Sequence, residues 1–295
     1  MTFVPRPPSG PTDLWRQQPV GIVGLGLIGG SLGLDLQQLG VEVRALVHRD
    51  ATAERARQRG LASEVSTDPS VLAPCGLVVL ALPLDRLLAP AGELVAALPP
   101  QAVITDVGSV KAPVLACWSG LVPRFVASHP MAGTAHSGVE AGQLGLFRGR
   151  PWVATPQPAT DPEALLVVQG LAEAVGADWL CCGPEAHDQA VALISHLPVL
   201  VSAALLQTAD RAGAGELAGL VRALASSGFA DTTRVGGGNP ELGTLMARSN
   251  RSAVLAALGE YRHTIDKVEA LVQGSHWPAL QQTLEHCQML RPEFL

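Results

Sequence analysis

The chain has 295 residues, 47% of them hydrophobic and 16% charged, so we expect one large domain or two ordinary ones with a substantial buried core. Its net charge of −6 and the lack of a basic run argue against a nucleic-acid partner. Its five cysteines include no C-x-x-C pair, so they indicate neither a disulfide framework nor a metal site, and they fit a reducing cytoplasm. Residues 1–19 are rich in proline and polar groups and lack an apolar signal region, which predicts a loose N-terminal extension.

Short apolar runs alternate with helical patterns from residue 20 to about residue 183. The expected strands are residues 20–23, 41–47, 77–81, 102–106, 124–127, 152–154 and 177–180. The expected helices are residues 32–39, 53–59, 87–98, 110–118 and 162–175. Several strands are continuously apolar, as in strands covered on both faces. This alternation predicts an α/β Rossmann-like dinucleotide-binding domain over residues 20–183, with a doubly wound parallel sheet.

Helical patterns dominate the remainder, residues 184–295. They are residues 186–193, 199–212, 216–226, 242–266 and 277–289, with a glycine-rich break at 236–238, and Pro198 is expected to end or kink a helix. We predict an all-helical substrate and dimerisation domain, because its alanine- and leucine-rich helices need a partner surface, and hence a homodimer. Residues 191–209 carry no formal charge and approach the length of a membrane span, but they contain polar residues and Pro198. We therefore predict a buried helix there and no membrane partner.

A glycine-rich turn follows the first predicted strand. Gly24, Gly26 and Gly29 have the G-x-G-x-x-G spacing of dinucleotide sites, with Leu27 and Ile28 between them. The first glycine permits a tight turn, the second allows backbone to approach a pyrophosphate, and the third lets helix pack on strand. The alternative is a tight strand-to-helix turn without a ligand. The flanking strand and helix favour the dinucleotide site, with these five residues in contact with the cofactor.

The residues after the second predicted strand bear on the choice of dinucleotide. An acidic residue about 20 positions beyond the glycines is typical of NAD sites, but this sequence places His48 and Arg49 there. A guanidinium suits the 2′-phosphate of NADP, and the Thr52 hydroxyl could add a contact. The neighbouring Asp50 keeps NAD possible. We also expect cofactor contacts from loops that follow later strands, through Ala81, Leu82, Pro83 and Gly108.

Two further strand ends carry candidate catalytic residues. Ser109 follows a predicted strand and is expected to face the cofactor cleft, to cap the next helix, or both. His129 follows another strand and precedes proline, so we expect it on a fixed loop at the edge that carries the glycine turn. A neutral imidazole there can accept a proton from a hydroxyl group near neutral pH.

The helical part contributes two more candidates. His196 lies inside an apolar run, where an imidazole without a partner is costly, so it needs a partner or a ligand. Arg234 follows a break at Gly228 and is a candidate for holding an anion. The alternative for Arg234 is an ion pair with Asp231 or another carboxylate.

Together these motifs resemble the family of prephenate and arogenate dehydrogenases of tyrosine biosynthesis. The resemblance rests on GLGLIGGS at 24–31, DVGSVK at 106–111, SHPMAGT at 128–134, SHLP at 195–198 and DTTR at 231–234, in this order. It implies an NADP-dependent oxidative decarboxylation, in which a cyclohexadiene loses hydride and carbon dioxide and becomes aromatic. His129 would take the proton of the ring hydroxyl, and Ser109 would orient that region. His196 and Arg234 would bind the substrate, with Arg234 on a carboxylate.

The resemblance has departures and leaves alternatives. Many members of the family read His-Leu-Pro-His, whereas here Val199 occupies the last position. The expected NADP preference and the short chain favour arogenate as the substrate. The alternative substrate is prephenate, which would give 4-hydroxyphenylpyruvate. Glu140 and Asp188 are conceivable partners for the ammonium group of arogenate. A β-hydroxyacid dehydrogenase or pyrroline-carboxylate reductase should offer a lysine in the helical domain, but Lys267 alone follows Lys111. A non-catalytic NADP-sensing module predicts cofactor binding without turnover.

Overall fold

The structure is a computed structural model, and it describes residues 14–134, 136–211 and 216–294. A six-stranded parallel sheet forms the centre of its first part, in the order β3-β2-β1-β4-β5-β6. The strands are β1 (Val20–Val23), β2 (Val43–Leu46), β3 (Glu64–Ser66), β4 (Leu77–Leu80), β5 (Val103–Asp106) and β6 (Phe125–Val126). The strand order reverses between β1 and β4, and ligands of open α/β sheets bind beside such a point. The predicted Rossmann-like sheet is confirmed.

Helices cover both faces of this sheet. They are α1 (Leu27–Gln38), α2 (Asp50–Gln58), α3 (Leu84–Leu88), α4 (Gly92–Ala97), α5 (Ala112–Trp118) and α6 (Pro162–Ala174), with short 3₁₀ turns η1 (Leu14–Gln17), η2 (Pro69–Leu72) and η3 (Val139–Ala141). Alternate residues of β4 enter different cores: Leu77 packs with α1 and α6, and Val78 packs with α3 and α5. Burial on both faces explains why the strands read as continuous apolar runs.

A second, three-stranded sheet lies beside the first. Its strands are β7 (Ser128–Pro130), β8 (Pro151–Ala154) and β9 (Asp178–Cys181), with β8 antiparallel to β7 and parallel to β9. The prediction of a loop for His129 is therefore wrong, because His129 lies in β7 and pairs with Val153. The chain leaves the first sheet after Val126 because the Ser128 amide and hydroxyl bind Asp106 instead of continuing the ladder.

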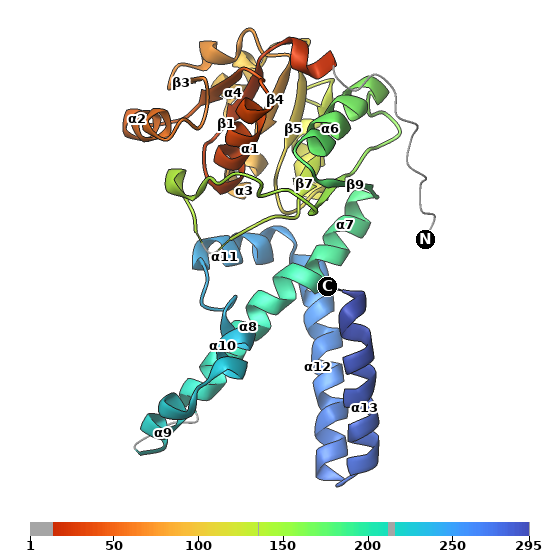
Figure 1. The fold of residues 1–295 in the computed structure, drawn as a ribbon. Coiled ribbons are helices and arrows are strands. Elements are labelled where there is room, and N and C mark those ends of the chain that lie inside the picture. The colour runs from red at the N-terminus through yellow and green to blue at the C-terminus, as the bar shows by residue number, and fades with distance from the viewer. Residues whose placement is uncertain (1–13, 135, 212–215, 295) are drawn as a thin grey trace.

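The helical part forms two arms that diverge from the sheet domain (Figure 1). A continuous helical rod begins it, made of α7 (Pro184–Val191), a π-helical turn η4 (Ala192–His196) and α8 (Leu197–Arg211). The α8 arm continues with α9 (Glu216–Leu224) and α10 (Ser227–Thr233), and α11 (Pro240–Ser249) returns toward the sheet domain. The α12 arm is a hairpin of α12 (Arg251–Gln273) and α13 (Trp277–Leu290), and η5 (Arg291–Glu293) follows α13. The predicted helical domain is confirmed.

Several predicted boundaries are wrong for local reasons. The helix expected over residues 87–98 is divided into α3 and α4, with Pro90 between them. The helix expected over residues 242–266 is divided at Asn250, whose side chain is turned inward to bind the Asp188 carbonyl oxygen. Of the two outcomes expected for Pro198, an end of the helix is not seen: Pro198 lies at the start of α8, directly after the π turn.

Two predictions about burial also need correction. The end of the N-terminal extension is not loose, because η1 is ordered and the Trp15 side chain is buried in the core beside α6. Residues 1–13 lie outside the described part. Among the described residues, the helical rod from Pro184 to Arg211 has the length and the apolar composition needed to cross a membrane. Such a helix alone is weak evidence for a membrane span. The prediction that it is buried does not hold within one chain, since most of α8 is half-buried or exposed.

Candidate active site

The glycine turn forms a cradle at the N-terminus of α1. Gly24 has a φ of +96°, and a Cβ atom there would lie 2.4 Å from the Ala81 carbonyl oxygen. A Cβ atom on Gly29 would lie 2.0 Å from the Gly24 carbonyl oxygen, so the helix and the turn need a glycine at both positions. Gly26 has nothing within 4 Å of its Cβ direction. This open space beside free N–H groups fits a dinucleotide pyrophosphate. Leu27 and Ile28 open the helix at this point.

The other predicted cofactor residues lie at the carboxyl ends of neighbouring strands. His48 and Arg49 follow β2, and Arg49 precedes the first residue of α2, with Thr52 in its first turn. Asp50 accepts a hydrogen bond from the Thr67 hydroxyl at 2.9 Å. Within the described residues, the exposed Arg49 guanidinium has no hydrogen-bond or ion-pair partner. Residues 81–83 follow β4, and Gly108 follows β5. The set therefore surrounds the point where the strand order reverses.

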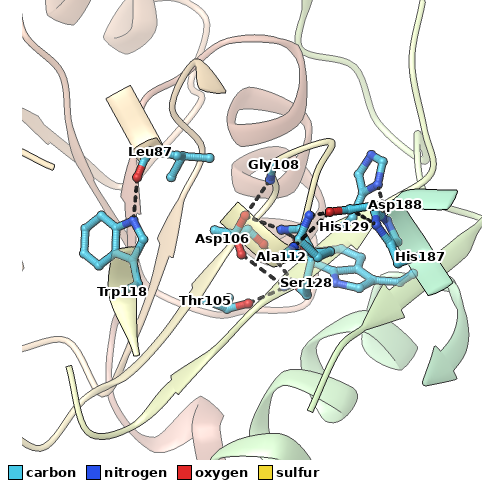
Figure 2. Close-up of polar contacts among 12 residues, drawn as sticks. Leu87, Thr105, Asp106, Gly108, Ala112, Trp118, Ser128, His129, His187 and Asp188 are labelled. Carbon is cyan, nitrogen blue, oxygen red and sulfur yellow. Dashed lines mark hydrogen bonds and ion pairs between the residues drawn. The ribbon is translucent and has the colours of Figure 1, made fainter. Parts of the chain in front are cut away.

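A buried polar network holds Ser128 at the start of β7, and Figure 2 shows its contacts. The Lys111 ammonium donates to Asp106 Oδ2 and, at 2.7 Å, to the Ser128 carbonyl oxygen, and the Lys111 and Asp106 side chains have no exposed surface. Burial raises the pKa of Asp106 and lowers the pKa of Lys111, and the charge of each opposes the shift of the other. The Ser128 hydroxyl lies 2.8 Å from Thr105 Oγ1 and accepts from Trp152 Nε1 at 3.0 Å. These contacts fix the backbone on which His129 lies.

His129 leads a chain of side chains that joins β7 to α7. His129 Nδ1 lies 3.0 Å from His187 Nε2, and His187 Nδ1 lies 2.8 Å from Asp188 Oδ1. His187 and Asp188 are buried, whereas His129 is half-buried. Burial, followed by the nearby Lys111 charge, lowers the pKa of His129 well below its usual value. His129 is therefore a neutral imidazole near pH 7, as a proton acceptor must be.

Asp188 also holds the start of α5. Its two carboxylate oxygens accept from the backbone N–H groups of Lys111 at 2.7 Å and Ala112 at 3.0 Å. The prediction that Ser109 caps this helix is therefore wrong: α5 begins at Ala112, and Asp188, from a distant segment, caps it. Ser109 stays half-buried in the loop between Gly108 and Lys111, and within the described residues its hydroxyl makes no hydrogen bond.

His196 lies in the π turn, buried, with a distinct hydrogen-bonding arrangement. Asn250 Nδ2 lies 3.3 Å from His196 Nδ1, and His196 Nε2 has no partner among the described residues. Burial lowers the pKa of His196 to about 4, so the ring is neutral at pH 7. Because the amide NH₂ group can only donate to Nδ1, the proton lies on Nε2. The Nε2–H group of His196 is therefore a buried donor without a partner among the described residues, as is typical of a group that binds a ligand.

Arg234 is placed differently from the other candidates. It directly follows α10 on the α8 arm, away from β7, and it is exposed (Figure 1). Within the described residues it makes no ion pair, so the alternative of a pair with Asp231 is not seen. The backbone N–H of Gly236 donates to Ser202 Oγ at 2.8 Å, which fixes the turn after Arg234. One chain does not bring Arg234 to His129, and its predicted role as an anion-binding residue stays a prediction.

Sequence reasoning missed the roles of His187, Asp188, Lys111 and Asp106. The two carboxylates considered for the ammonium of arogenate are already engaged: Asp188 as described, and Glu140 with Arg55 at 2.6 Å. A signal did exist for the buried pair, since Asp106 ends the buried strand β5 and Lys111 directly precedes α5 five residues later. No spacing in the sequence indicates that Asp188 reaches the start of α5.

Comparison with known proteins identifies two family domains in this chain. Residues 32–180 match the family described as "Prephenate dehydrogenase, nucleotide-binding domain", and residues 183–286 match "Prephenate dehydrogenase, dimerization domain". The chain belongs to the prephenate dehydrogenase family. This confirms the predicted membership in the family of prephenate and arogenate dehydrogenases.

Individual members of the prephenate dehydrogenase family differ in their described substrates. A prephenate dehydrogenase of Bacillus subtilis is 30% identical over 85% of this chain and 69% of its own length. The crystal structure of Synechocystis arogenate dehydrogenase is 41% identical, with a TM-score of 0.81 over 94% of this chain and 100% of that one. A prephenate dehydrogenase of A. aeolicus, solved with hydroxyphenyl propionate and NAD⁺, is 28% identical, with a TM-score of 0.88 over 94% of this chain and 98% of that one.

Proposed function

We propose that this chain oxidatively decarboxylates arogenate to tyrosine with NADP⁺ as hydride acceptor. The observation that carries the reaction type is His129, a neutral and half-buried imidazole that the polar network holds at the edge of the nucleotide-binding domain. The likeness to Synechocystis arogenate dehydrogenase supports arogenate. Prephenate is the second candidate, because two of the related proteins are named for it.

His129 acts on the ring hydroxyl of the substrate. The bound nicotinamide supplies the hydride acceptor. As the hydroxyl-bearing carbon loses hydride, His129 takes the hydroxyl proton, and the ring carboxylate leaves as carbon dioxide. Loss of hydride and carbon dioxide from the ionised acid leaves tyrosine without a net change in protons, so His129 returns its proton to the phenol oxygen. Alignment of His129 with this hydroxyl is the main catalytic requirement, since aromatisation supplies driving force.

Three further residues bind and orient the substrate. Ser109 lies in the loop between β5 and α5 and offers a free hydroxyl to the ring hydroxyl. His196 offers its unused Nε2–H from the helical domain. Arg234 is the proposed ligand of a substrate carboxylate, and the proposed dimer would have to bring its exposed guanidinium to the site, since one chain does not.

Arg49 supports NADP over NAD. The guanidinium follows β2, where the adenosine ribose of a bound dinucleotide lies, and it is exposed and free to bind a 2′-phosphate. Asp50, which would favour NAD, is held by the Thr67 hydroxyl. The cofactor preference therefore rests on His48, Arg49 and Thr52.

The diverging arms support a homodimer. Large apolar side chains on both arms are exposed in one chain, among them Leu220, Leu224, Leu255, Trp277, Leu284 and Met289. Exposed apolar surface of this extent marks an interaction site, and the matching family domain is described as a dimerisation domain. We propose that the arms of two copies pack together, in a cytoplasmic enzyme whose five cysteines are free thiols. Sedimentation at micromolar concentration should give the mass of a dimer, and a monomeric mass contradicts this part of the proposal.

A four-way assay tests the function. Purified protein is mixed with arogenate or prephenate and with NADP⁺ or NAD⁺, and reduced cofactor and aromatic product are followed. We expect tyrosine from arogenate with NADP⁺. 4-Hydroxyphenylpyruvate from prephenate alone keeps the reaction type and overturns the substrate, and cofactor binding without turnover in all four mixtures overturns the proposal.

His129→Asn tests the role of the base in the same assay. It should lower kcat by about 100-fold or more, the range for a lost general base, with little change in KM. The control is Glu93→Gln, which changes an exposed side chain on α4, outside the arms, and should keep full activity. An unchanged kcat in His129→Asn removes His129 as the base.

A further inference from the structure

Two hydrogen bonds connect the side chains of Asp188, His187 and His129, and the donor and acceptor of each can be assigned in turn. We propose that His187 and Asp188 are positioning residues that hold the proton of His129 on Nδ1 and leave Nε2 free as the base. This inference deepens the proposed function and rests on it. It is carried by the two contacts of 3.0 Å and 2.8 Å that join the three side chains (Figure 2).

The direction begins at Asp188, because an ionised carboxylate can only accept hydrogen bonds. Three donors surround it: the backbone N–H groups of Lys111 and Ala112, and the His187 ring. His187 must therefore donate from Nδ1. The proposed arrangement requires a neutral His187 ring, in which the other nitrogen, Nε2, presents a lone pair to His129.

This lone pair determines the tautomer of His129. His129 Nδ1 lies 3.0 Å from His187 Nε2 and must donate to it, since two lone pairs at this distance would repel. The proton of the neutral His129 ring then lies on Nδ1, and its Nε2 carries the lone pair that a base requires. The titratable groups that act on His129 are Lys111, His187 and His196. A proton on His187 would reverse the arrangement and leave His129 Nε2 unable to accept.

The same carboxylate also connects the two domains. Asp188 belongs to α7, the first helix of the helical part, whereas the N–H groups that it accepts belong to the loop and helix after β5. Ser109 lies two residues before Lys111 in this loop. A single side chain thus sets the tautomer of the base and the position of the loop that carries the proposed hydroxyl partner.

The test uses a pair of variants at His187. His187→Leu removes the acceptor for His129 Nδ1 and should let the His129 proton move to Nε2. We expect kcat to fall by 10-fold or more, with KM within about 3-fold and an altered pH profile of kcat. His187→Gln keeps an acceptor oxygen near the position of Nε2 and should recover most of the activity. A merely structural role predicts no such rescue.

A second measurement is independent of turnover. In protein labelled with ¹⁵N-histidine and without substrate, protonated and bare ring nitrogens give separate signals, and the His129 signals are those missing in His129→Asn. We expect the proton on Nδ1 in the parent and in His187→Gln, and on Nε2 in His187→Leu.

The two measurements separate this inference from the proposed function. A proton on Nε2 of His129 in the parent, or an unchanged tautomer and kcat in His187→Leu, overturns the inference. If the four-way assay shows no turnover while the tautomers are as expected, the proposed function fails and the hydrogen-bond direction stands.

Discussion

Replacement of Lys111 by methionine tests the buried network most directly. Methionine has a similar length and no charge, so the change removes the two donated bonds of the ammonium, to Asp106 and to the Ser128 carbonyl oxygen. The Asp106 carboxylate keeps its bonds from the N–H groups of Gly108 at 2.8 Å and Ser128 at 3.1 Å, but it loses its only close countercharge among the described residues.

The expected cost follows from complete burial. Both side chains of the pair have no exposed surface, and loss of one partner of a buried pair costs about 3–5 kcal/mol because a charge is left uncompensated. This is a large part of a typical free energy of unfolding of about 5–15 kcal/mol. Without the ammonium, the pKa of Asp106 rises further, so folded Lys111→Met takes up a proton at a higher pH than the parent does. Its deficit relative to the parent should therefore shrink as the pH falls.

Urea unfolding at one fixed protein concentration measures this cost. The free energy of unfolding is determined at pH 8 and pH 5.5 for the parent, Lys111→Met, and Lys111→Met combined with Asp106→Asn. The double variant should recover part of the loss, because it leaves no buried charge. The control is Arg55→Gln, which breaks an exposed pair with Glu140 in the sheet domain and should change little. A loss below about 1 kcal/mol in Lys111→Met, or no recovery in the double variant, refutes the reasoning.

The remaining predictions concern the cofactor, the substrate, pH and packing. Arg49→Ala should raise KM for NADP⁺ by about 10-fold or more and leave KM for NAD⁺ nearly unchanged, since one charge-assisted phosphate contact contributes about 1.5–3 kcal/mol; equal effects on both cofactors contradict the 2′-phosphate contact. Arg234→Gln should mainly raise KM for the substrate in steady-state assays, and an unchanged KM would make Arg234 structural. Burial lowers the pKa of His196 from 6.5 to about 4, so as the pH falls this histidine is protonated in the unfolded protein before it is protonated in the folded protein. Its contribution to the free energy of unfolding is therefore full above pH 6.5 and falls by about 3 kcal/mol between pH 6.5 and 4. Urea unfolding across this range should show a smaller decline in stability for His196→Gln than for the parent, and an equal decline would exclude His196 as its cause. Gly33→Ala should destabilise the protein by about 1–3 kcal/mol, because the added Cβ atom would lie 2.0 Å from the Leu61 carbonyl oxygen. The control is Gly92→Ala, whose added Cβ atom would have no neighbour within 4 Å and should not destabilise the protein. Equal thermal midpoints for the two variants would contradict this reasoning.

Periodicity and glycine spacing were enough to predict the sheet domain. The runs 20–23 and 77–81 are apolar at every position, because their side chains enter cores on both faces of the sheet, and this makes such strands easy to locate. Strand β3 was missed because it is short, lies at the sheet edge and contains the exposed Glu64. Strand β7 was missed because its three residues include a serine and a proline, and tertiary hydrogen bonds hold it in place.

The candidate site was predictable only in part. His129 could be selected because local signals place it at a strand end, and Gly24, Gly26 and Gly29 because their backbone requirements are local. The role of Asp188 at the start of α5 could not be predicted, because the two N–H groups that it accepts from lie 76 and 77 residues away in sequence. Only the folded chain makes that carboxylate a cap of α5 and a partner of His187. Arg234 is exposed after α10 in one chain, so its predicted role as an anion-binding residue stays a prediction.

The rod from Pro184 to Arg211 has a mechanical consequence. Its 28 residues form one helical element, about 42 Å long at 1.5 Å per residue, with Asp188 near one end and the α8 arm at the other. In the proposed dimer, such a stiff element would connect the packing of the arms to the His187 ring. A substitution in the proposed interface, far from the cofactor, is therefore expected to lower kcat before it lowers affinity. The proposed interface and the proposed base would then lie near the two ends of one helical element.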